Sequence, residues 1–432
     1  SEMCIRDRTH ADWFTTDPSD FEAGDIIFRD PETGLPNGVF MGAKAPRLVS
    51  IAIPRKTLKQ KVESLVLGLK ILSSYGITSV VEAGSVMGSV TQVYQEAYDS
   101  GDFPVRVILY DGWYRSGDPE SLGAPSEIEQ RLRALGFHNL GDNMFRIRGA
   151  KSSADGGVGS RSAAVSEPYL PIPDDPLGEK NFGSLRDPGF NYRLSQFKHL
   201  ADYGWEIHTH ACGDAAIRQT MDVYKILMDN IKKKDPEADL RWSIIHAYLP
   251  DEPATSVIND MAEYGIIAAV NPSHIYFEGD SFLRNIGPER MARHTPFKTF
   301  LDAGVVMASG SDYPNNSPDP WIGMYAMCTR KHQISGEVYG PEQCLSFLEA
   351  LKTFTINGAY LTYDDDIKGS LRAGKLADLV VIDADMITVT VEDLLEMRHK
   401  VLITMVGGRI VYQKPGFIPD EVQREEKENS FL

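Results

Sequence analysis

The sequence predicts an α/β protein, a (β/α)₈ TIM-like barrel followed by a small C-terminal β domain, the remnant of a β-sandwich. Two observations predict the barrel. Short β-rich runs alternate with longer helical patterns, and most of these runs are continuously apolar, as strands covered on both faces are. A third observation, the appearance of glycine-punctuated strands after residue 365, predicts the β domain.

Seven runs have the composition of barrel strands. They are residues 78–82, 105–110, 144–148, 205–208, 242–246, 266–270 and 305–309. Helical patterns lie between them, for example over 58–75, 215–232 and 281–303. Because eight parallel strands close a barrel of this kind, one strand is unaccounted for. We expect the first strand to be missing from this chain and to lie upstream of residue 1.

The remaining segments complete the predicted organisation. Residues 1–8 have the look of a non-native leader, since no initiator Met stands at position 1. We expect the barrel over 9–365, the small β domain over 366–415 and a charged, solvated tail over 416–432. Within the β domain, Gly407-Gly408 between two apolar runs signals a hairpin turn.

Composition excludes several classes of partner. The 432 residues include 44 Lys and Arg against 61 Asp and Glu, a formal net charge of −17 that disfavours nucleic acid and anionic lipid. No apolar run approaches the roughly 18 residues of a membrane helix. Four cysteines are scattered without a CxxC pair, which fits a reducing compartment and a cytoplasmic location. We expect neither nucleic acid nor membrane as a partner.

Ionisable side chains recur where the predicted strands end. In chain order they are Lys151, His208, His210, His246, His274 and Asp312. Barrel active sites are built at the carboxyl ends of the strands, and imidazole and carboxylate are ligands that suit Zn²⁺, Mn²⁺ or Fe²⁺. The pattern therefore predicts a divalent metal site at this end of the barrel.

Each residue also has a structural alternative. His208 and His210 share one strand face, which a surface strand would also produce. His246 taken alone is more often a core histidine than a ligand. Asp312 could bind metal and accept a proton from water, or could cap a helix N-terminus. Lys151 could become a bridging ligand when carboxylated by CO₂, or could pair with Asp155 or Asp214.

Several segments together resemble the amidohydrolase superfamily, and most closely its branch of YtcJ-like proteins and N-substituted formamide deformylases. They are KSSADGGVGSRSA, HTHACGD, IIHAYLP, NPSHIYFEGD, SGSDYP and INGAYLTYDDDIKGSLRAGKLADLVVID. The resemblance extends from about Thr9 to Tyr412. The family's opening sandwich strands, its first barrel strand with an HxH ligand pair and the insertion that follows are not found here, which points to an N-terminal truncation of roughly 100–150 residues.

The resemblance implies roles for individual residues. Lys151, often carboxylated in the family, His210, His246 and Asp312 would hold one or two divalent metals, and zinc is the expected ion. Asp312 would also be the catalytic acid and base. The predicted substrate-binding residues are Asp155, Arg161, His208 and His274, with His208 a neighbour and not an established ligand.

The function that follows is hydrolysis of a C–N bond, amide-like but not a peptide bond, in a small-molecule substrate by metal-activated water. Two alternatives stay open. The same scaffold supports deamination, lactone or phosphotriester hydrolysis, and isomerisation. A relative without metal could instead be a non-catalytic binding protein. The truncated chain could be inactive, and a homodimer is left open.

Overall fold

The computed structural model describes residues 26–30, 32–41, 53–84, 89–112, 140–171, 180–186, 189–250 and 256–417. The predicted leader 1–8 and residues 418–432 of the predicted tail lie outside them. The chain divides into two compact units, residues 1–63 and residues 64–432, which are described separately. Among the described residues, no helix combines the length and apolar character needed to cross a bilayer.

The first unit contains a β-hairpin that the sequence analysis did not predict. Strands β1 (Ile26–Arg29) and β2 (Pro36–Met41) pair antiparallel, with Ile26 opposite Met41. The Asp30 carboxylate accepts backbone N–H bonds from Glu32 and Thr33, at 3.0 and 2.8 Å, which forms the connecting turn. Helix α3 (Leu58–Ser74) begins in this unit and continues into the second.

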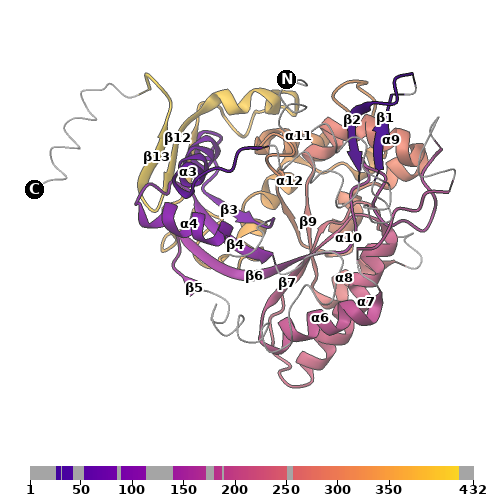
Figure 1. Cartoon of the computed structure of the whole chain (residues 1–432). Helices are drawn as coiled ribbons and strands as arrows, with labels where there is room; N and C mark the ends of the chain where they lie inside the picture. Colours follow the sequence, from indigo (N-terminus) through magenta and orange to yellow (C-terminus); the bar gives the residue numbers. More distant parts are fainter. Residues whose placement is uncertain are drawn as a thin grey trace, which may run out of the picture. The chain divides into compact units, whose positions relative to one another are not determined.

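The second unit is built on a curled sheet of seven parallel strands, in the order β10-β9-β8-β7-β6-β4-β3 (Figure 1). Their bounds are β3 (Ser79–Glu82), β4 (Arg106–Gly112), β6 (Phe145–Ser153), β7 (Glu206–Ala211), β8 (Ser243–His246), β9 (Ile267–Val270) and β10 (Met307–Ser309). All seven predicted barrel strands are therefore confirmed. One short strand, β5 (Leu140–Gly141), adds an antiparallel pairing to β6. Within the described part of the chain, no strand joins the two edges β10 and β3.

Helices alternate with the strands along the chain. They are α4 (Ser89–Asp99), α6 (Phe190–Asp202), α7 (Asp214–Lys232), α8 (Val257–Tyr264), α9 (Ser273–Arg293), α10 (Phe297–Asp302), α11 (Pro320–Thr329), α12 (Phe347–Thr353) and α13 (Ile356–Leu361). Two 3₁₀ segments, η5 (Pro341–Gln343) and η6 (Glu392–Lys400), follow α11 and β11. The single helical pattern predicted over 281–303 is two helices, and α9 itself kinks at Gly287, where φ is 78° before Pro288.

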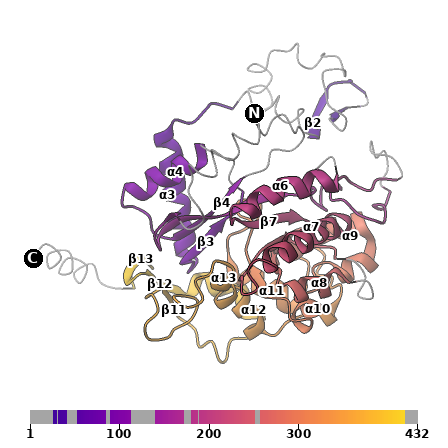
Figure 2. The same cartoon turned by 90° about the horizontal axis from the view of Figure 1, so that it is seen from below.

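The core lies between the sheet and these helices. Figure 2 shows α6, α7 and α8 side by side on the outside of the sheet. Every residue of β8 is buried, and Ile207, Ile244 and Ile267 are fully inaccessible to water. Strands buried on both faces need continuous apolar sequence, which is why these runs did not alternate.

In the predicted C-terminal β domain, the structure has a three-stranded antiparallel sheet that belongs to the second unit, in the order β11 (Leu379–Ile382), β12 (Val401–Val406) and β13 (Arg409–Gln413). The predicted turn at Gly407-Gly408 joins β12 to β13, and both glycines have positive φ, 58° and 80°. The sheet is fastened to β4 by the guanidinium of Arg106, whose Nε and Nη2 donate to Asp378 at 2.6 and 2.8 Å.

Candidate metal centre

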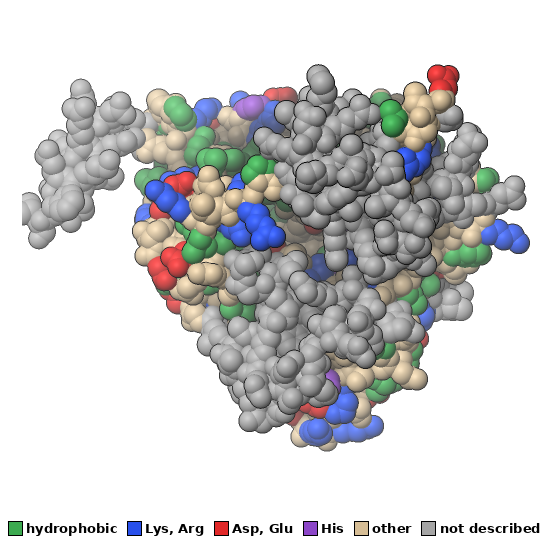
Figure 3. Space-filling view, in the orientation of Figure 1, with side chains coloured by type: hydrophobic (Ala, Val, Ile, Leu, Met, Phe, Trp, Pro, Cys, Tyr) green, Lys and Arg blue, Asp and Glu red, His purple; other side chains and the backbone are tan. Residues whose placement is uncertain are grey.

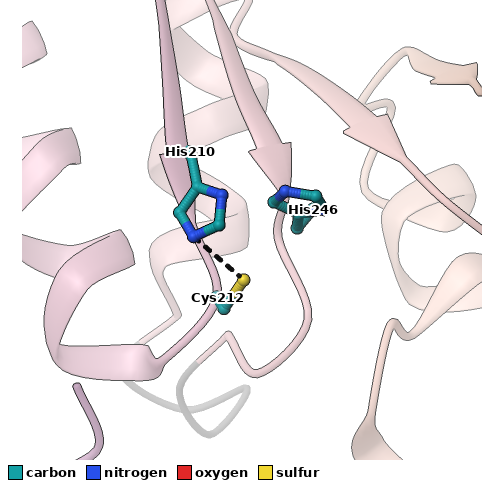
Figure 4. Close-up of side chains that lie close together, drawn as sticks. All are labelled: His210, Cys212 and His246. Carbon is teal, nitrogen blue, oxygen red and sulfur yellow. Dashed lines mark hydrogen bonds between the residues drawn. The ribbon is translucent and has the colours of Figure 1, made fainter. Parts of the chain in front are cut away.

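Three potential metal ligands meet at the carboxyl ends of two neighbouring strands. His210 lies on β7, Cys212 follows its last residue, and His246 is the last residue of β8 (Figure 4). One ligand atom from each residue lies within 4.8 Å of the other two. The imidazole centroids of His210 and His246 are 4.4 Å apart, and Cys212 Sγ lies 3.5 Å from His210 Nε2. This is a compact set of two imidazoles and one thiol.

Strained backbone brings His246 to this cluster. His210 and Ile245 are register partners on parallel strands, so their side chains share one face and a regular strand would turn His246 to the other. His246 and Ala247 instead have φ of 75° and 48°, a left-handed conformation that costs roughly 1–3 kcal/mol per non-glycine residue. Bonds from Ala247 N to Ala211 O (3.1 Å) and Leu249 N to Cys212 O (3.0 Å) hold the turn against β7.

The cluster's protonation suits a cation. Burial, reinforced by the charges of His246 and Lys151, holds the pKa of His210 well below its usual range. Burial also lowers the pKa of His246 well below its usual range, with Lys151 and His274 adding to the effect. Both rings are therefore neutral at pH 7, and neutral imidazole is the form that ligates metals. Among the described residues, the buried Nδ1 of His246 has no hydrogen-bond partner.

The two other predicted ligands, Lys151 and Asp312, interact with Cys212 through their charges. Lys151, on β6, donates from Nζ to Ala83 O at the end of β3, at 2.8 Å. Burial lowers the pKa of Lys151 to about 8, against the opposing charges of Asp312, Cys212 and Glu82. Asp312 follows β10 with a left-handed φ of 56°, and its carboxylate accepts from Asn315 Nδ2 at 2.8 Å.

The structural alternatives for these two residues do not match their surroundings. The helix after β10 is capped by Asp319, whose carboxylate accepts from Trp321 N, so Asp312 is not its N-cap. Asp214 accepts bonds from Ser166, while Lys151 donates to a backbone carbonyl.

Asp155 organises the loops around the cluster. Its carboxylate is fully buried and accepts three backbone N–H bonds, from Cys212 (3.0 Å), Gly213 (2.8 Å) and Ala164 (2.9 Å). It also lies 3.5 Å from His210 Nε2. Burial raises its pKa to about 7 despite these donors. The contacts give Asp155 a positioning role, and its predicted part in substrate binding stays a prediction.

The other predicted substrate residues occupy three different settings. His208 is fully buried one level below His210, stacked on Tyr110 with ring centroids 3.7 Å apart and bonded through Nδ1 to Ser243 Oγ. Arg161 is buried and donates from Nη2 to Leu170 O at 2.7 Å. His274 lies in the first turn of α9, and its Nε2 is 3.8 Å from Asp312 Oδ2. His208 is also beside a predicted site residue, because it is the register partner of Lys151 on the neighbouring strand.

Cys212 was missed as a potential ligand by sequence reasoning. In the sequence it is one of four scattered cysteines. The available signal was its spacing, since a residue two positions after His210 that continues the strand's extended path points to the same face. Its thiol is buried, and burial raises its pKa well above the usual range, with Asp155 and Asp312 adding to the shift. Only a nearby positive charge, such as a bound cation, would favour the thiolate here.

Comparisons with known proteins agree with this architecture. The chain is 27% identical over 408 residues to the putative amidohydrolase YtcJ of Bacillus subtilis, which covers 93% of this chain and 69% of that protein. It is 25% identical over 395 residues to the N-substituted formamide deformylase of Arthrobacter pascens, covering 89% of this chain and 67% of that protein. The chain thus spans about two thirds of the length of the curated relatives it matches.

The fold and the family are matched over most of the chain. An uncharacterized metal-dependent hydrolase from Pyrococcus horikoshii has a similar structure, with a TM-score of 0.66 and 21% identity, covering 84% of this chain and 67% of that one. The sequence profile described as the amidohydrolase family matches residues 2–412. The chain therefore belongs to the amidohydrolase family.

Proposed function

We propose that the protein of which this chain is a part hydrolyses an amide-like C–N bond, not a peptide bond, in a small molecule by means of metal-activated water. The observation that carries the proposal is the neutral set of His210, Cys212 and His246 at the carboxyl end of the strands, in which His210 is half-buried and the other two are buried. Family membership and the activity for which the A. pascens relative is named, deformylation of N-substituted formamides, support the choice of bond.

The donor set fits a divalent ion, and zinc is the ion we propose. Imidazole nitrogen and thiolate sulfur are its common protein ligands, and the orphaned Nδ1 of His246 is a buried atom in need of a partner. Lys151, carboxylated or not, and Asp312 would complete the set. When bound, the metal would lower the pKa of a water and polarise the scissile carbonyl.

The chain's own residues would supply positioning and proton transfer. Asp312, whose side chain is 37% exposed, would take a proton from water and pass it to the leaving nitrogen. Asp155 holds the loop that carries Cys212 and Gly213. His274 is placed beside Asp312 to bind the carbonyl oxygen of the substrate.

Charged side chains of both signs lie on the described part of the face seen in Figure 3, where lysine and arginine side chains are interspersed with acidic ones. Such mixing gives no extended field of one sign to attract a polyanion.

The test is metal analysis combined with a substrate panel on protein purified without chelator. We expect about one or more equivalents of metal per chain, and turnover of N-formyl amines in preference to N-acyl amino acids and lactones. Asp312→Asn should abolish that turnover and leave thermal unfolding close to wild type. A metal-free protein would favour a binding role, and lactones as the preferred substrates would favour the alternative chemistry on this scaffold.

A further inference from the structure

A short hydrogen bond links the cluster's strand to its neighbouring helix. The hydroxyl of Tyr248, two residues after β8, lies 2.6 Å from Nδ1 of His274 in the first turn of α9. Tyr248 is 3% exposed, and this is the one hydrogen bond of its hydroxyl among the described residues. If Nδ1 carried a hydrogen and donated it, the phenolic hydrogen would be buried without an acceptor. The phenol is therefore the donor and Nδ1 the acceptor.

This assignment determines the other ring nitrogen. A neutral imidazole whose Nδ1 accepts a hydrogen bond carries its proton on Nε2. In the described part of the chain, Nε2 of His274 makes no well-aligned hydrogen bond, although the side chain is only 7% exposed. The backbone of Ser311 is the acceptor that His274 approaches, and this contact raises the pKa of the ring. Asp312 Oδ2 lies 3.8 Å away, too far for a direct bond. The result is a buried N–H donor beside Ser311 and Asp312 whose hydrogen bonding is incomplete.

Tyr248 is itself held firmly. Its ring stacks on that of His294, with centroids 4.7 Å apart and planes at 29°. It also contacts the ring of Phe282. Its carbonyl accepts a bond of 2.6 Å from Thr295 N. The left-handed residues His246 and Ala247 precede it, so the same turn that aims His246 at His210 also aims Tyr248 at His274.

A second acceptor competes for His274. Glu278 lies one turn along α9, and its Oε1 is 3.5 Å from His274 Nδ1 while accepting a bond of 2.9 Å from Asn316 Nδ2. Without the Tyr248 hydroxyl, Nδ1 would gain by carrying the proton and donating it to this carboxylate. The ring would then present a bare Nε2, an acceptor, toward Asp312.

We propose that Tyr248 is a positioning residue: its hydroxyl fixes His274 in the Nε2–H tautomer, so that the ring presents a donor beside Asp312 for a carbonyl oxygen of the substrate. The binding of a substrate carbonyl oxygen by that donor rests on the proposed hydrolysis, whereas the tautomer of His274 does not. The two parts can therefore fail separately.

The tautomer is tested by long-range ¹H–¹⁵N NMR on protein labelled with ¹⁵N-histidine, with metal as isolated and no substrate. The His274 signals are assigned by their loss in His274→Gln. We expect an unprotonated Nδ1 and a protonated Nε2 in wild type, and conversion toward Nδ1–H in Tyr248→Phe, which keeps the ring that stacks on His294. Tyr276→Phe, on the same helix but without a hydrogen bond to His274, is the matched control and should leave the His274 signals unchanged.

A wild-type ring protonated on Nδ1, or a Tyr248→Phe spectrum identical to wild type, overturns the proposal whatever the protein hydrolyses. If the substrate panel yields turnover, Tyr248→Phe should lower kcat by about 10- to 100-fold, as loss of groups that orient a site's primary residues does, with KM changed little. Absence of all turnover would count against the proposed function, and the NMR result would still decide the tautomer.

Discussion

The two ends of the parallel strands bury polar side chains in opposite ways. At the amino ends, charged groups form close ion pairs: Arg106 with Asp378 at 2.6 Å, Arg146 with Asp364 at 2.5 Å and Arg148 with Glu206 at 2.9 Å, with all six side chains no more than 10% exposed. Among these side chains, Arg146 Nε is a buried atom without a hydrogen bond in the described part of the chain. At the carboxyl ends, His246 Nδ1 and His274 Nε2 are buried and make no well-aligned hydrogen bond with a described residue. Left-handed backbone at His246, Ala247 and Asp312 adds strain there.

The difference indicates that the amino ends of the strands serve stability and the carboxyl ends serve ligand binding. A satisfied buried pair is strongly destabilised when one partner is lost, because the other charge remains buried alone. An unsatisfied buried nitrogen already lowers stability, and at a metal or substrate site a ligand can complete it. We therefore expect substitutions at the amino ends to change stability and substitutions at the carboxyl ends to change metal binding and turnover.

The largest expected effect is at the amino ends. Asp378→Ala leaves the Arg106 guanidinium buried without its bidentate partner and also removes the acceptor of Gly407 N. The free energy of unfolding should fall by about 3–5 kcal/mol, as measured by denaturant titration. The double variant Arg106→Leu/Asp378→Ala should recover part of this loss. If Asp378→Ala unfolds like wild type, the amino ends do not carry the stability assigned to them.

The next prediction concerns the carboxyl ends, where we expect metal content and turnover to change and stability to change little. His246→Gln should lower metal content well below one equivalent and reduce turnover by more than about 100-fold, beyond the range seen for groups that only orient ligands. Unfolding of the metal-free protein should change by less than about 1 kcal/mol, since the lost nitrogen made no hydrogen bond. His332→Gln is the control: His332 is also buried but pairs with Asp280, and its loss should leave metal content unchanged.

A third effect depends on pH. Burial lowers the pKa of Lys151 from 10.5 to about 8 in the folded state, so between about pH 8 and 10.5 the unfolded chain binds more protons and the folded state gains stability as pH rises. The penalty of the buried ammonium is fully present below pH 8. Lys151→Met should therefore be more stable than wild type by up to about 3 kcal/mol near pH 7, and this advantage should vanish by pH 10.5. Parallel stability–pH curves for the two proteins would contradict the assignment. A carbamate signal with ¹³C-bicarbonate, absent in Lys151→Met, would test carboxylation directly.

The barrel could be predicted well from the sequence because the evidence for each strand lies in a short stretch of residues. Continuous apolar runs ending in His210, His246 or Asp312 located the strands and their carboxyl ends, and Gly407-Gly408 located a hairpin. What could not be predicted depends on geometry that no local pattern encodes. The hairpin 26–41 is short and precedes the alternating pattern, and the side chain of His246 reaches its neighbours only through a left-handed backbone that residue types at 246 and 247 do not require.

Substitution of Cys212 has the smallest expected effect, and its result distinguishes two possible ligand sets at the carboxyl ends. If its thiol ligates the ion together with His210 and His246, Cys212→Ser should weaken zinc affinity by about 10-fold or more, roughly 1.4 kcal/mol, and hardly alter folding, since the serine hydroxyl is smaller and the backbone N–H of residue 212 still bonds to Asp155. Competition with a chromophoric chelator measures the change. If the affinity stays at the wild-type value, the ion is held by the imidazoles with Lys151 and Asp312, and the nearby thiol only packs against His210. In either case the contrast with the amino ends holds only if the folding free energy of the metal-free variant remains within about 0.5 kcal/mol of wild type.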